Sequence, residues 1–570
     1  MKSIFKYLSM AWIVTILFGC EDAFLSQTNP NAITQETFWR TSEDFDRGLN
    51  TVYGALQFSS ISGSDVSTEM VQSDMGGTES WYAHYQYLEL SFNDASPHVQ
   101  NKWNQCYIGI FRANQVIENI ENPASQLSEE EMKLVEGQAK FLRAFYYFTL
   151  AHSYGGAVIH TSIPVKGEDF HQPFQNKERV TSDVIIPDLE NAIANLPQEW
   201  GNSNDMGRAT WGAATSLLAK VYLYQQDWAK AKELFKEVID SRIYSLVPNV
   251  RDNYTHENEF NEESIFEVSY SEVLKPGTSG GQTDDTPWAA GSEATGLGRA
   301  MGQLNFGGWN TVLASYYLHE LMIYDEMDPE NVINNGMRYS QRAHGTIAPI
   351  DADGLYYGVP TGTKGGWAFG QSAYVKKHSN WYHLEIEDPQ DRSGINFRHI
   401  RLADVYLMYA EAVLEADGNV QEAITYIDLV RKRAGVLTLS QYMEDNGGKF
   451  PQLHVSKEVH GSHPMVDASV ETIRTHLRMV ERPVELCFEG HRWKDLVRWG
   501  IVKEVLTQHR ADEVWRLENL DPANNPLPPM NIREHIRRDY AVSSVNYTPS
   551  AHDYYPIPTS ERQINNGLGL

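Results

Sequence analysis

Cysteine is scarce in this sequence, and so are motifs that hold metals or activate nucleophiles. Three cysteines occur among 570 residues, no CxxC pair is present, and no Cys/His spacing matches a zinc site. HExxH does not occur, which argues against zincin proteases. The stretch DADG at 351–354 resembles the start of a calcium loop, but Gly362 stands where the twelfth-position Glu is expected. A simple turn is the better interpretation, and we expect no metal and no cofactor.

Positive charge is also in short supply. The chain carries 47 Lys and Arg against 75 Asp and Glu, a formal net charge of −28. Nucleic-acid binding needs a basic face that displaces counterions, and adsorption to anionic lipid headgroups needs basic clusters. The charge balance therefore argues against both classes of partner and favours a soluble, acidic protein.

Long hydrophobic runs are missing as well, apart from one short run at the start of the chain. Residues Tyr7 to Phe18 are almost wholly apolar and follow Lys2 and Lys6. Because a bilayer-spanning helix needs about 20 apolar residues, this run is too short to cross a membrane. Its length and basic flank are typical of the hydrophobic region of a signal peptide.

The run ends in Leu17-Phe18-Gly19-Cys20 rather than in the small residues that a secretory peptidase prefers. This tetrapeptide resembles the lipobox of bacterial lipoproteins, L-x-[GA]-C, with a bulkier residue than usual at Phe18. The resemblance implies that residues 1–19 are removed and that Cys20 carries two or more acyl chains, enough for stable anchoring. An ordinary signal peptide with an incidental cysteine is the alternative. If Cys20 is acylated, two cysteines remain, far apart in sequence. We expect Cys106 and Cys487 to be free, buried thiols rather than a disulfide.

Two acids, Glu21 and Asp22, follow Cys20 directly. This pair resembles the surface-export signal of Bacteroidota lipoproteins. The resemblance implies a protein that is lipid-anchored in the outer membrane and faces the extracellular side.

Amphipathic helices dominate much of the remaining chain. A capping-box pattern joins Thr41 and Asp44, and apolar residues then recur on one helical face. Segments 103–120 and 132–156 have the same periodicity, and Gly155-Gly156 supplies a C-cap for the second.

Two helical segments, 216–241 and 406–435, have the residue spacing of tetratricopeptide hairpins. Such hairpins place small residues where their two helices touch. The alanines at these positions are twelve residues apart in the first segment (Ala219 and Ala231) and thirteen apart in the second (Ala410 and Ala423). A weaker unit pairs 141–150 with 183–197, and a fourth uses the helix that ends at KDLVRWG. We therefore predict a mainly α fold, a tetratricopeptide-like scaffold of about four helical hairpins.

The scaffold is interrupted by irregular sequence rich in Gly, Pro, Ser, Asn and Asp. Residues 275–310 show almost no periodicity, and a loop of this length is usually functional or disordered. Its tryptophans favour an ordered, function-bearing surface, because disordered segments are poor in aromatic residues. A second aromatic-rich irregular stretch covers 76–90. We divide the chain into a signal peptide (1–19), an N-terminal helical region (20–246) and a C-terminal region (247–570), the last comprising an irregular part (247–399), a helical part (400–500) and a loop-rich tail (501–570).

Exposed aromatic side chains in these irregular stretches are candidate carbohydrate contacts. Flat indole and phenol rings pack against the C–H face of a sugar, while nearby polar groups bind its hydroxyls. For each residue, packing within its own loop is the alternative. The candidates are Trp81, Tyr82, Tyr85, Trp288, Trp309 and Trp367.

The spacing of Glu485 and Glu489 does not fit a catalytic pair of carboxylates. Glu485 and Glu489 are four residues apart, which places them on one face of a helix, whereas a glycosidase needs opposed carboxylates roughly 5–10 Å apart. With Arg482, Arg492 and Arg498 nearby, we expect a partly buried ion-pair network instead.

Several segments in their joint order resemble the SusD/RagB family of nutrient-binding outer-membrane lipoproteins of Bacteroidota. They lie at 20–56, 103–117, 138–164, 400–418, 481–500 and 554–567. The resemblance implies a non-catalytic lid on a SusC-like TonB-dependent transporter, which captures an oligosaccharide, or in some members a peptide, and delivers it for import. It also implies that the tetratricopeptide face contacts the transporter and that the irregular half holds the ligand.

Two rival functions remain open on the sequence. A lipid-anchored glycoside hydrolase would need an acid-bearing motif on strands or loops, which we do not find. A tetratricopeptide scaffold that binds only protein would have no use for the aromatic-rich irregular half.

Overall fold

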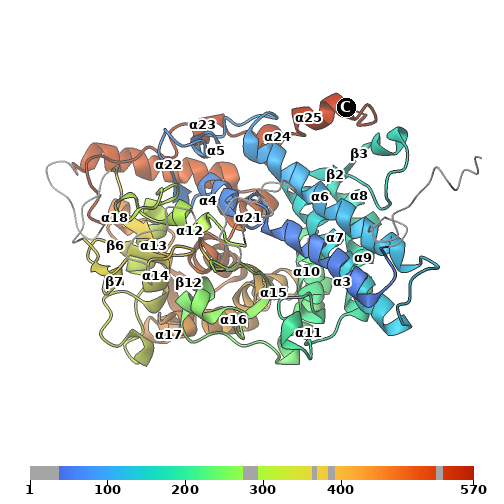
Figure 1. Ribbon diagram of the computed structural model, residues 1–570. Coiled ribbons are helices and arrows are strands. Elements are labelled where there is room, and N and C mark those ends of the chain that lie inside the picture. Colours follow the sequence, from blue (N-terminus) through green and yellow to red (C-terminus); the bar gives the residue numbers. More distant parts are fainter. Residues whose placement is uncertain (1–37, 274–292, 363–368, 383–391, 522–529, 570) are drawn as a thin grey trace, which may run out of the picture.

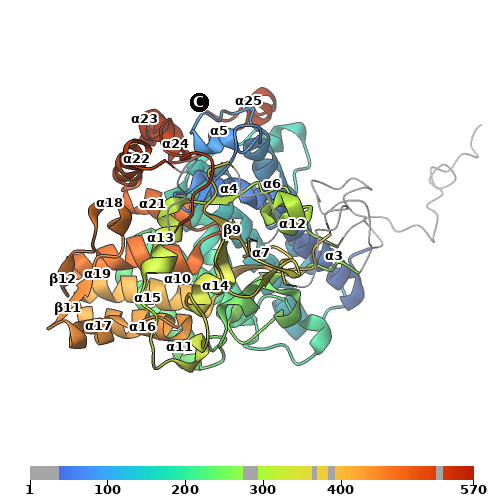
Figure 2. The ribbon, with the colours of Figure 1, turned by 90° about the vertical axis from the view of Figure 1, so that its left-hand side faces the viewer.

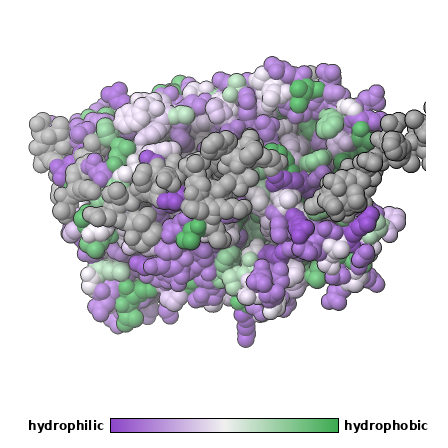
Figure 3. All heavy atoms as spheres, viewed as in Figure 1, coloured by the Kyte–Doolittle hydropathy of each residue, from purple (hydrophilic) through white to green (hydrophobic). Residues whose placement is uncertain are grey.

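The computed structural model describes residues 38–273, 293–362, 369–382, 392–521 and 530–569. The fold is mainly helical, with short two-stranded antiparallel sheets between the helices. Figure 1 shows the N-terminal helices on the right and the irregular half, with its short elements, on the left. The face in Figure 3 is largely hydrophilic, with small, separate hydrophobic patches. In the described residues, no helix is both long enough and apolar enough to span a bilayer.

Seven helices form the scaffold, and consecutive members pack against each other from α6 to α16. Figure 2 shows α11, α15 and α16 as neighbours at the bottom of the molecule. The predicted hairpins are confirmed as α10 with α11, α15 with α16 and, in the weaker case, α7 with α9. The seven helices are α6 (Pro97–Ile120), α7 (Glu129–Tyr154), α9 (Ile186–Asn195), α10 (Trp211–Tyr224), α11 (Trp228–Ser241), α15 (Leu402–Asp417) and α16 (Val420–Ala434).

Local sequence sets the ends of these helices as predicted. Before α3 (Ser42–Gly54), Asp44 N donates to Thr41 Oγ1 at 3.3 Å and Thr41 N donates to the Asp44 carboxylate at 2.9 Å, a reciprocal capping box. At the end of α7, Gly155 adopts φ +74°, a left-handed conformation that costs glycine little. The helix therefore stops where the sequence indicated.

The irregular half is built from short elements joined by loops. Strand β4 (Ser264–Val268) pairs with β10 (Phe397–Arg401), and β6 (Ile347–Pro349) pairs with β9 (Ala373–Val375). Along the chain, three short helices follow β4 and precede β6: α12 (Leu297–Met301), α13 (Tyr316–Tyr324) and α14 (Gln341–Thr346). Because β10 runs directly into α15, the irregular half is joined to the scaffold through one continuous strand and helix.

The prediction of a loop-rich tail is wrong at its start. Residues Val502–Asn519 form α22, which crosses the upper left of Figure 1. Its buried face begins with apolar residues such as Val505 but continues with His509, Asp512 and Arg516. No apolar stripe runs its full length, which is why periodicity did not reveal it.

The single-helix interpretation of the Glu485–Glu489 segment is also wrong. Helix α20 (Arg482–Leu486) ends before α21 (Arg492–Trp499) begins, because Phe488 and Gly490 adopt φ +62° and +77°. The resulting turn lets the two carboxylates approach one guanidinium from different directions.

That guanidinium belongs to Arg401, the last residue of β10. The prediction of an ion-pair network is confirmed, but the cations that bind Glu485 and Glu489 include Arg401 and Arg433, whereas the predicted Arg482, Arg492 and Arg498 pair with other acids. Arg401 donates to Glu263 at 2.7 Å, to Glu485 at 2.7 Å and to both oxygens of Glu489 at 2.8 Å. Arg433 of α16 also pairs with Glu263 and with Glu485. All five side chains are buried. Burial alone would raise the pKa of Glu489, but the charge of Arg401 holds it well below its ordinary value.

A neighbouring group of buried ion pairs extends this network through the scaffold. Glu481 accepts from Arg342 at 2.6 Å and from Arg431 at 2.8 Å. Arg482 donates to Asp404 at 2.8 Å and to Asp495 at 2.9 Å. These pairs tie α14, α15, α16 and the α20–α21 turn into one unit.

The two cysteines beyond residue 37 are free and buried, as expected. Burial raises the pKa of the Cys106 thiol to about 12 and that of the Cys487 thiol to about 11. Both thiols therefore stay protonated and pack as small apolar groups.

Replacing Arg401 by Met is expected to destabilise the fold by about 3–5 kcal/mol, because Glu263, Glu485 and Glu489 then lose their shared buried cation. Chemical denaturation measures the loss. The matched control is Arg47→Met, which removes an exposed pair with Glu43 and should cost less than about 1 kcal/mol. Equal losses in the two variants would contradict a central role for the Arg401 cluster.

Candidate functional site

The two aromatic-rich stretches predicted from sequence lie side by side. Strand β1 (Gly76–Gly77) pairs antiparallel with β5 (Leu313–Ala314), so the start of the 76–90 stretch runs beside the end of the long irregular segment. Next to this ladder, Thr78 Oγ1 donates to the Thr311 carbonyl at 2.6 Å. Side chains just beyond either strand are therefore brought to the same surface.

Glycines permit the close backbone approaches that this arrangement needs. A Cβ on Gly76 would lie 2.6 Å from the Met70 carbonyl oxygen. A Cβ on Gly308 would lie 2.1 Å from the Gly302 carbonyl oxygen, across a loop that Trp309 N closes by donating to the Arg299 carbonyl at 2.7 Å. Only glycine fits these positions without displacing the loop.

We call Trp81, Tyr82, Trp309 and Phe369 the aromatic cluster; ring contacts join the first two and Phe369, and a backbone hydrogen bond links Trp309 to them. The ring of Trp81 lies 5.8 Å from that of Tyr82 and meets that of Phe369 edge-on at 5.0 Å. The Tyr82 hydroxyl donates to the Trp309 carbonyl and links the two stretches. Trp81 is 56% exposed and Trp309 is 43% exposed, so both present large apolar faces to solvent.

Polar groups flank these rings. The guanidinium of Arg299 lies 5.0 Å from the centre of the Trp309 ring, a cation–π contact that orients the indole. Glu79 lies three residues before Tyr82, and its Oε1 is buried without a hydrogen-bond partner in the described part of the chain. Burial raises the pKa of Glu79, and the charge of Arg537 opposes this rise. Exposed aromatic faces with charged groups nearby suit a ligand that has both C–H faces and hydroxyls.

Phe369 holds its place in a strained conformation. Its φ is +60°, unusual for a bulky residue, and its backbone N–H donates to the Glu534 carboxylate at 3.1 Å. Such strain often accompanies function, because the surrounding structure must hold the residue there.

The structure brings together three of the six predicted aromatic residues. Trp81, Tyr82 and Trp309 belong to the aromatic cluster, whereas Trp288 and Trp367 lie outside the described residues. Tyr85 begins α5 (Tyr85–Leu88) and packs, half-buried, against the core. Burial, together with a hydrogen bond to Glu89, raises the pKa of Tyr85 to about 12.

Sequence reasoning missed Phe369, Arg299 and Glu79 as members of this site. Phe369 stands two residues after the predicted Trp367, in the tripeptide WAF, and this aromatic neighbour is the sequence feature that could have identified it as a site residue. The importance of Arg299 and Glu79 depends on loop closure and burial, which no local pattern reveals.

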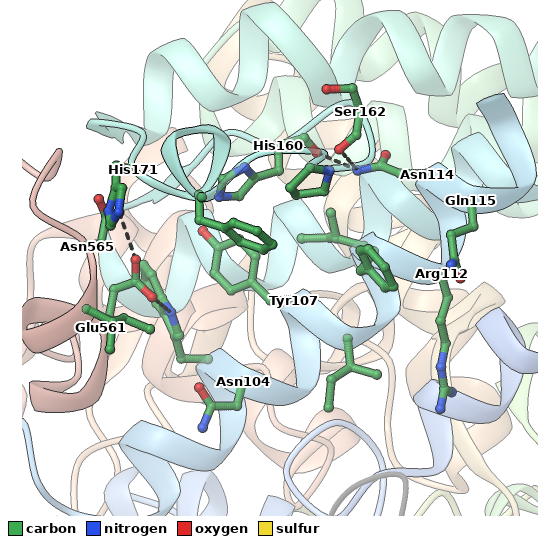
Figure 4. Close-up of a pocket in the computed structure, with 18 residues that line it drawn as sticks. Asn104, Tyr107, Arg112, Asn114, Gln115, His160, Ser162, His171, Glu561 and Asn565 are labelled. Carbon is green, nitrogen blue, oxygen red and sulfur yellow. Dashed lines mark hydrogen bonds between the residues drawn. The ribbon is translucent and has the colours of Figure 1, made fainter. Parts of the chain in front are cut away.

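A second candidate site is a cavity of about 760 Å³ beside α6 (Figure 4). Its walls come from α6, from the loop after β2 (Gly156–Val158), from η3 (Gly167–Phe170) and from α25 (Thr559–Ile564). A volume of this size is typical of ligand pockets. The sequence offered one sign of this cavity, which our prediction did not use: the wall residues of α6 recur on one face of the helix, at Asn104, Ile108, Phe111 and Gln115.

The walls of this cavity are firmly held. Tyr107, in the middle of Figure 4, donates through its hydroxyl to the Val158 carbonyl at 2.8 Å and accepts from Val158 N at 2.7 Å. Asn114 donates to the His160 carbonyl at 2.9 Å, and Asn565 donates to Glu561 at 2.8 Å. The lining is mostly apolar, and burial lowers the pKa of His160, which favours a neutral imidazole.

The acidic residues that the sequence offered as catalytic or calcium ligands are paired with arginines of the same chain. Glu485 and Glu489 are bound by Arg401, as described above. In the DADG stretch, Asp351 pairs with Arg338 at 2.8 Å, and Gly354 adopts φ +78°, as in a turn. The described ranges contain no group of three or more His, Cys, Asp or Glu side chains placed to hold a metal.

Comparison with known protein families identifies the chain. Residues 262–569 match the model of the SusD family, and residues 23–223 match a model described as "Starch-binding associating with outer membrane". Because the first match covers more than half of the chain, the protein belongs to the SusD family. Members of this family are non-catalytic, glycan-binding proteins associated with the outer membrane, so the glycoside hydrolase alternative is set aside.

Individual relatives agree with this assignment over almost their whole length. The chain is similar to SusD-like protein P25 of Formosa agariphila, with 23% identity over 97% of this chain and 95% of the relative. Among solved structures, a SusD superfamily protein from Bacteroides vulgatus matches with a TM-score of 0.71 and 22% identity, over 93% of this chain and 99% of that one. A laminarin-binding SusD-like protein matches with a TM-score of 0.65 and 23% identity, over 92% and 98%.

Replacing Gly308 by Ala is expected to open the loop that carries Trp309, because the new methyl would collide with the Gly302 backbone. Amide hydrogen exchange in residues 299–311 should become faster, and the tryptophan emission should shift as Trp309 moves. Gly201→Ala is the matched control, since a Cβ there meets nothing within 4 Å. Unchanged exchange in the Gly308 variant would show that the loop does not depend on this close approach.

Proposed function

We propose that this SusD family protein captures an oligosaccharide at the cell surface and delivers it to a SusC-like TonB-dependent outer-membrane transporter. The observation that carries the proposal is the aromatic cluster, where Trp81 and Trp309 from distant stretches of the chain present exposed indole faces beside Glu79 and Arg299. The name of the laminarin-binding structural relative supports a glycan ligand. A peptide is the alternative ligand for the same transport role.

In this proposal, ligand binding requires little rearrangement of the rings. Tyr82 ties its stretch to the Trp309 backbone, and Arg299 holds the Trp309 indole, so the exposed faces are oriented before a sugar arrives. Covering one indole face with a pyranose removes on the order of 100 Å² of apolar surface, worth about 2–3 kcal/mol. Hydroxyls on the sugar edge would then donate to Glu79 once its carboxylate turns outward, since its unpaired oxygen is buried in the free protein.

The partner and the anchor belong to the same proposal. The name of the N-terminal family model supports association with the outer membrane. We propose that acyl chains on Cys20 hold the protein in the outer leaflet, that Glu21 and Asp22 direct it to the outer face, and that the tetratricopeptide-like helices contact the transporter. Residues 1–37 lie outside the described residues.

Replacing Trp81 or Trp309 by Ala is expected to weaken glycan binding about tenfold to a hundredfold, because each variant loses one stacking face. The measurement is calorimetric titration of residues 21–570 against a panel of glycans, including laminarin, and of peptides. Binding by the wild-type protein to no member of the panel would count against the proposed ligand classes.

Phe111→Ala is the matched control for this experiment. Phe111 is also an exposed aromatic residue, but it lines the cavity beside α6 rather than the aromatic cluster. If Phe111→Ala weakens binding while both tryptophan variants bind normally, the ligand site is the cavity and the assignment to the aromatic cluster is wrong.

Replacing Cys20 by Ser should remove the lipid anchor, because a hydroxyl cannot form the thioether. Metabolic labelling with a fatty acid should label the wild type and not the variant, and the variant should leave the membrane fraction. Cys106→Ser is the control, since that thiol is buried in the fold and should not affect labelling. Absence of label from the wild type would support the alternative of an ordinary signal peptide, and persistent labelling of the Cys20 variant would place the acyl chains on another residue.

A further inference from the structure

A small internal cavity of about 70 Å³ lies where the scaffold meets the C-terminal region, and it is lined by an unusual number of cationic side chains. Lys102 comes from α6, Lys220 from α10 and Lys494 from α21. Glu69, on α4 (Ser67–Gln72), completes one wall. Lys102 and Lys220 are buried, so their ammonium groups have lost almost all contact with bulk water.

The carboxylates in reach of these lysines do not balance their charge. Lys102 and Lys494 share one partner, since Lys102 Nζ donates to Glu69 Oε1 and Lys494 Nζ lies 2.7 Å from Glu69 Oε2. Lys220 Nζ lies 3.2 Å from Asp404, whose other oxygen accepts from Arg482 at 2.8 Å. Lys220 Nζ also lies 3.3 Å from His491 Nδ1, and Lys494 Nζ donates to the Gly490 carbonyl at 3.2 Å, but neither of these groups carries a negative charge. Three ammonium groups therefore depend on two carboxylates, and one of these also serves a guanidinium.

The remaining acid in the cavity wall is already occupied. Glu489 lines the cavity, but its oxygens accept from Arg401 and from Lys377 at 2.8 Å. Because a buried charge is costly unless it is paired, all three lysines can stay charged together only with a further anionic partner.

Unpaired polar groups surround the same place. The Tyr224 hydroxyl, in the wall of this cavity, has no hydrogen-bond partner among the described residues. A smaller cavity shares Glu69 and Lys494, and in its wall Gln72 Nε2 and Ser153 Oγ are likewise unpaired within the described ranges. Each of these groups can donate a hydrogen bond, as an anion or an ordered water requires.

We propose that this cavity binds a small inorganic anion, chloride in the native environment, between the ammonium groups of Lys102, Lys220 and Lys494. The volume accommodates one monatomic anion with a few waters, whereas an organic acid or a sugar ring is too large. A metal cation would face three like charges. Water alone would satisfy the unpaired donors but would leave the charge uncompensated.

Burial works against the charged forms of these lysines. Burial lowers the pKa of Lys494 to about 8 and that of Lys102 well below its ordinary value. An anion between them favours their charged forms and offsets this effect of burial. The bound ion then joins α6 and α10 of the scaffold to α21, so it acts as a structural link between the N-terminal and C-terminal regions.

Crystals of residues 21–570 grown in sodium bromide provide the direct test. Data collected at the bromine absorption edge should show an anomalous peak inside the cavity, in contact with the lysine Nζ atoms. Density that refines as waters, with no anomalous peak in the cavity, would overturn the proposal.

Thermal unfolding distinguishes a structural anion from an adventitious ion only. At equal ionic strength, the unfolding temperature in sodium chloride should exceed that in sodium gluconate by a few degrees, because a ligand that binds only the folded state stabilises it. Lys494→Met should abolish the difference, and the exposed-lysine control Lys133→Met should preserve it. A bromide peak without any chloride-dependent shift in the wild type would mean an adventitious ion only and would overturn the structural role.

Discussion

The contact of Arg401 with Glu263, Glu485 and Glu489 is the interaction on which the rest of the structure depends. Arg401 is the last residue of β10, which pairs with β4 in the irregular half. The next residue, Leu402, begins α15 of the scaffold. One guanidinium thus fixes a strand, a helix and the turn between α20 and α21. Because removing one partner of a buried ion pair costs far more than forming the pair gains, the cluster enforces a single arrangement of these parts.

The loops that display the exposed tryptophans are held by contacts of their own. The aromatic cluster stands on segments with little regular structure, and its geometry depends on β1 pairing with β5 and on the hydrogen bond from Tyr82 to the Trp309 backbone. Loops supported in this way can differ in sequence without disturbing the scaffold beneath them. A helical frame can thus carry a loop-borne binding surface without any change in the frame itself.

Local features of the structure were largely predictable from the sequence. The Thr41 capping box, the end of α7 at Gly155 and the hairpin of α10 with α11 follow from short-range chemistry and helical spacing. Features set by distant contacts were not. The segment from Glu485 to Glu489 has helical spacing, yet left-handed residues at Phe488 and Gly490 turn it toward Arg401.

The candidate site shows the same division. Aromatic content in two irregular stretches identified Trp81 and Trp309, but their proximity depends on a ladder between residues more than 200 positions apart. Tyr85 has the same composition signal and packs against the core instead. The cavity beside α6 needs α25, from the far end of the chain, to complete its wall, so the pattern on α6 alone does not mark it as a site.

The measurement that tests the central claim most directly is a crystal structure of residues 21–570 with the oligosaccharide that binds most tightly. The account predicts a pyranose ring lying flat against Trp81 or Trp309, with a sugar hydroxyl within hydrogen-bonding distance of Glu79. An oligosaccharide bound only in the cavity beside α6, with both tryptophans still exposed to solvent, would contradict it.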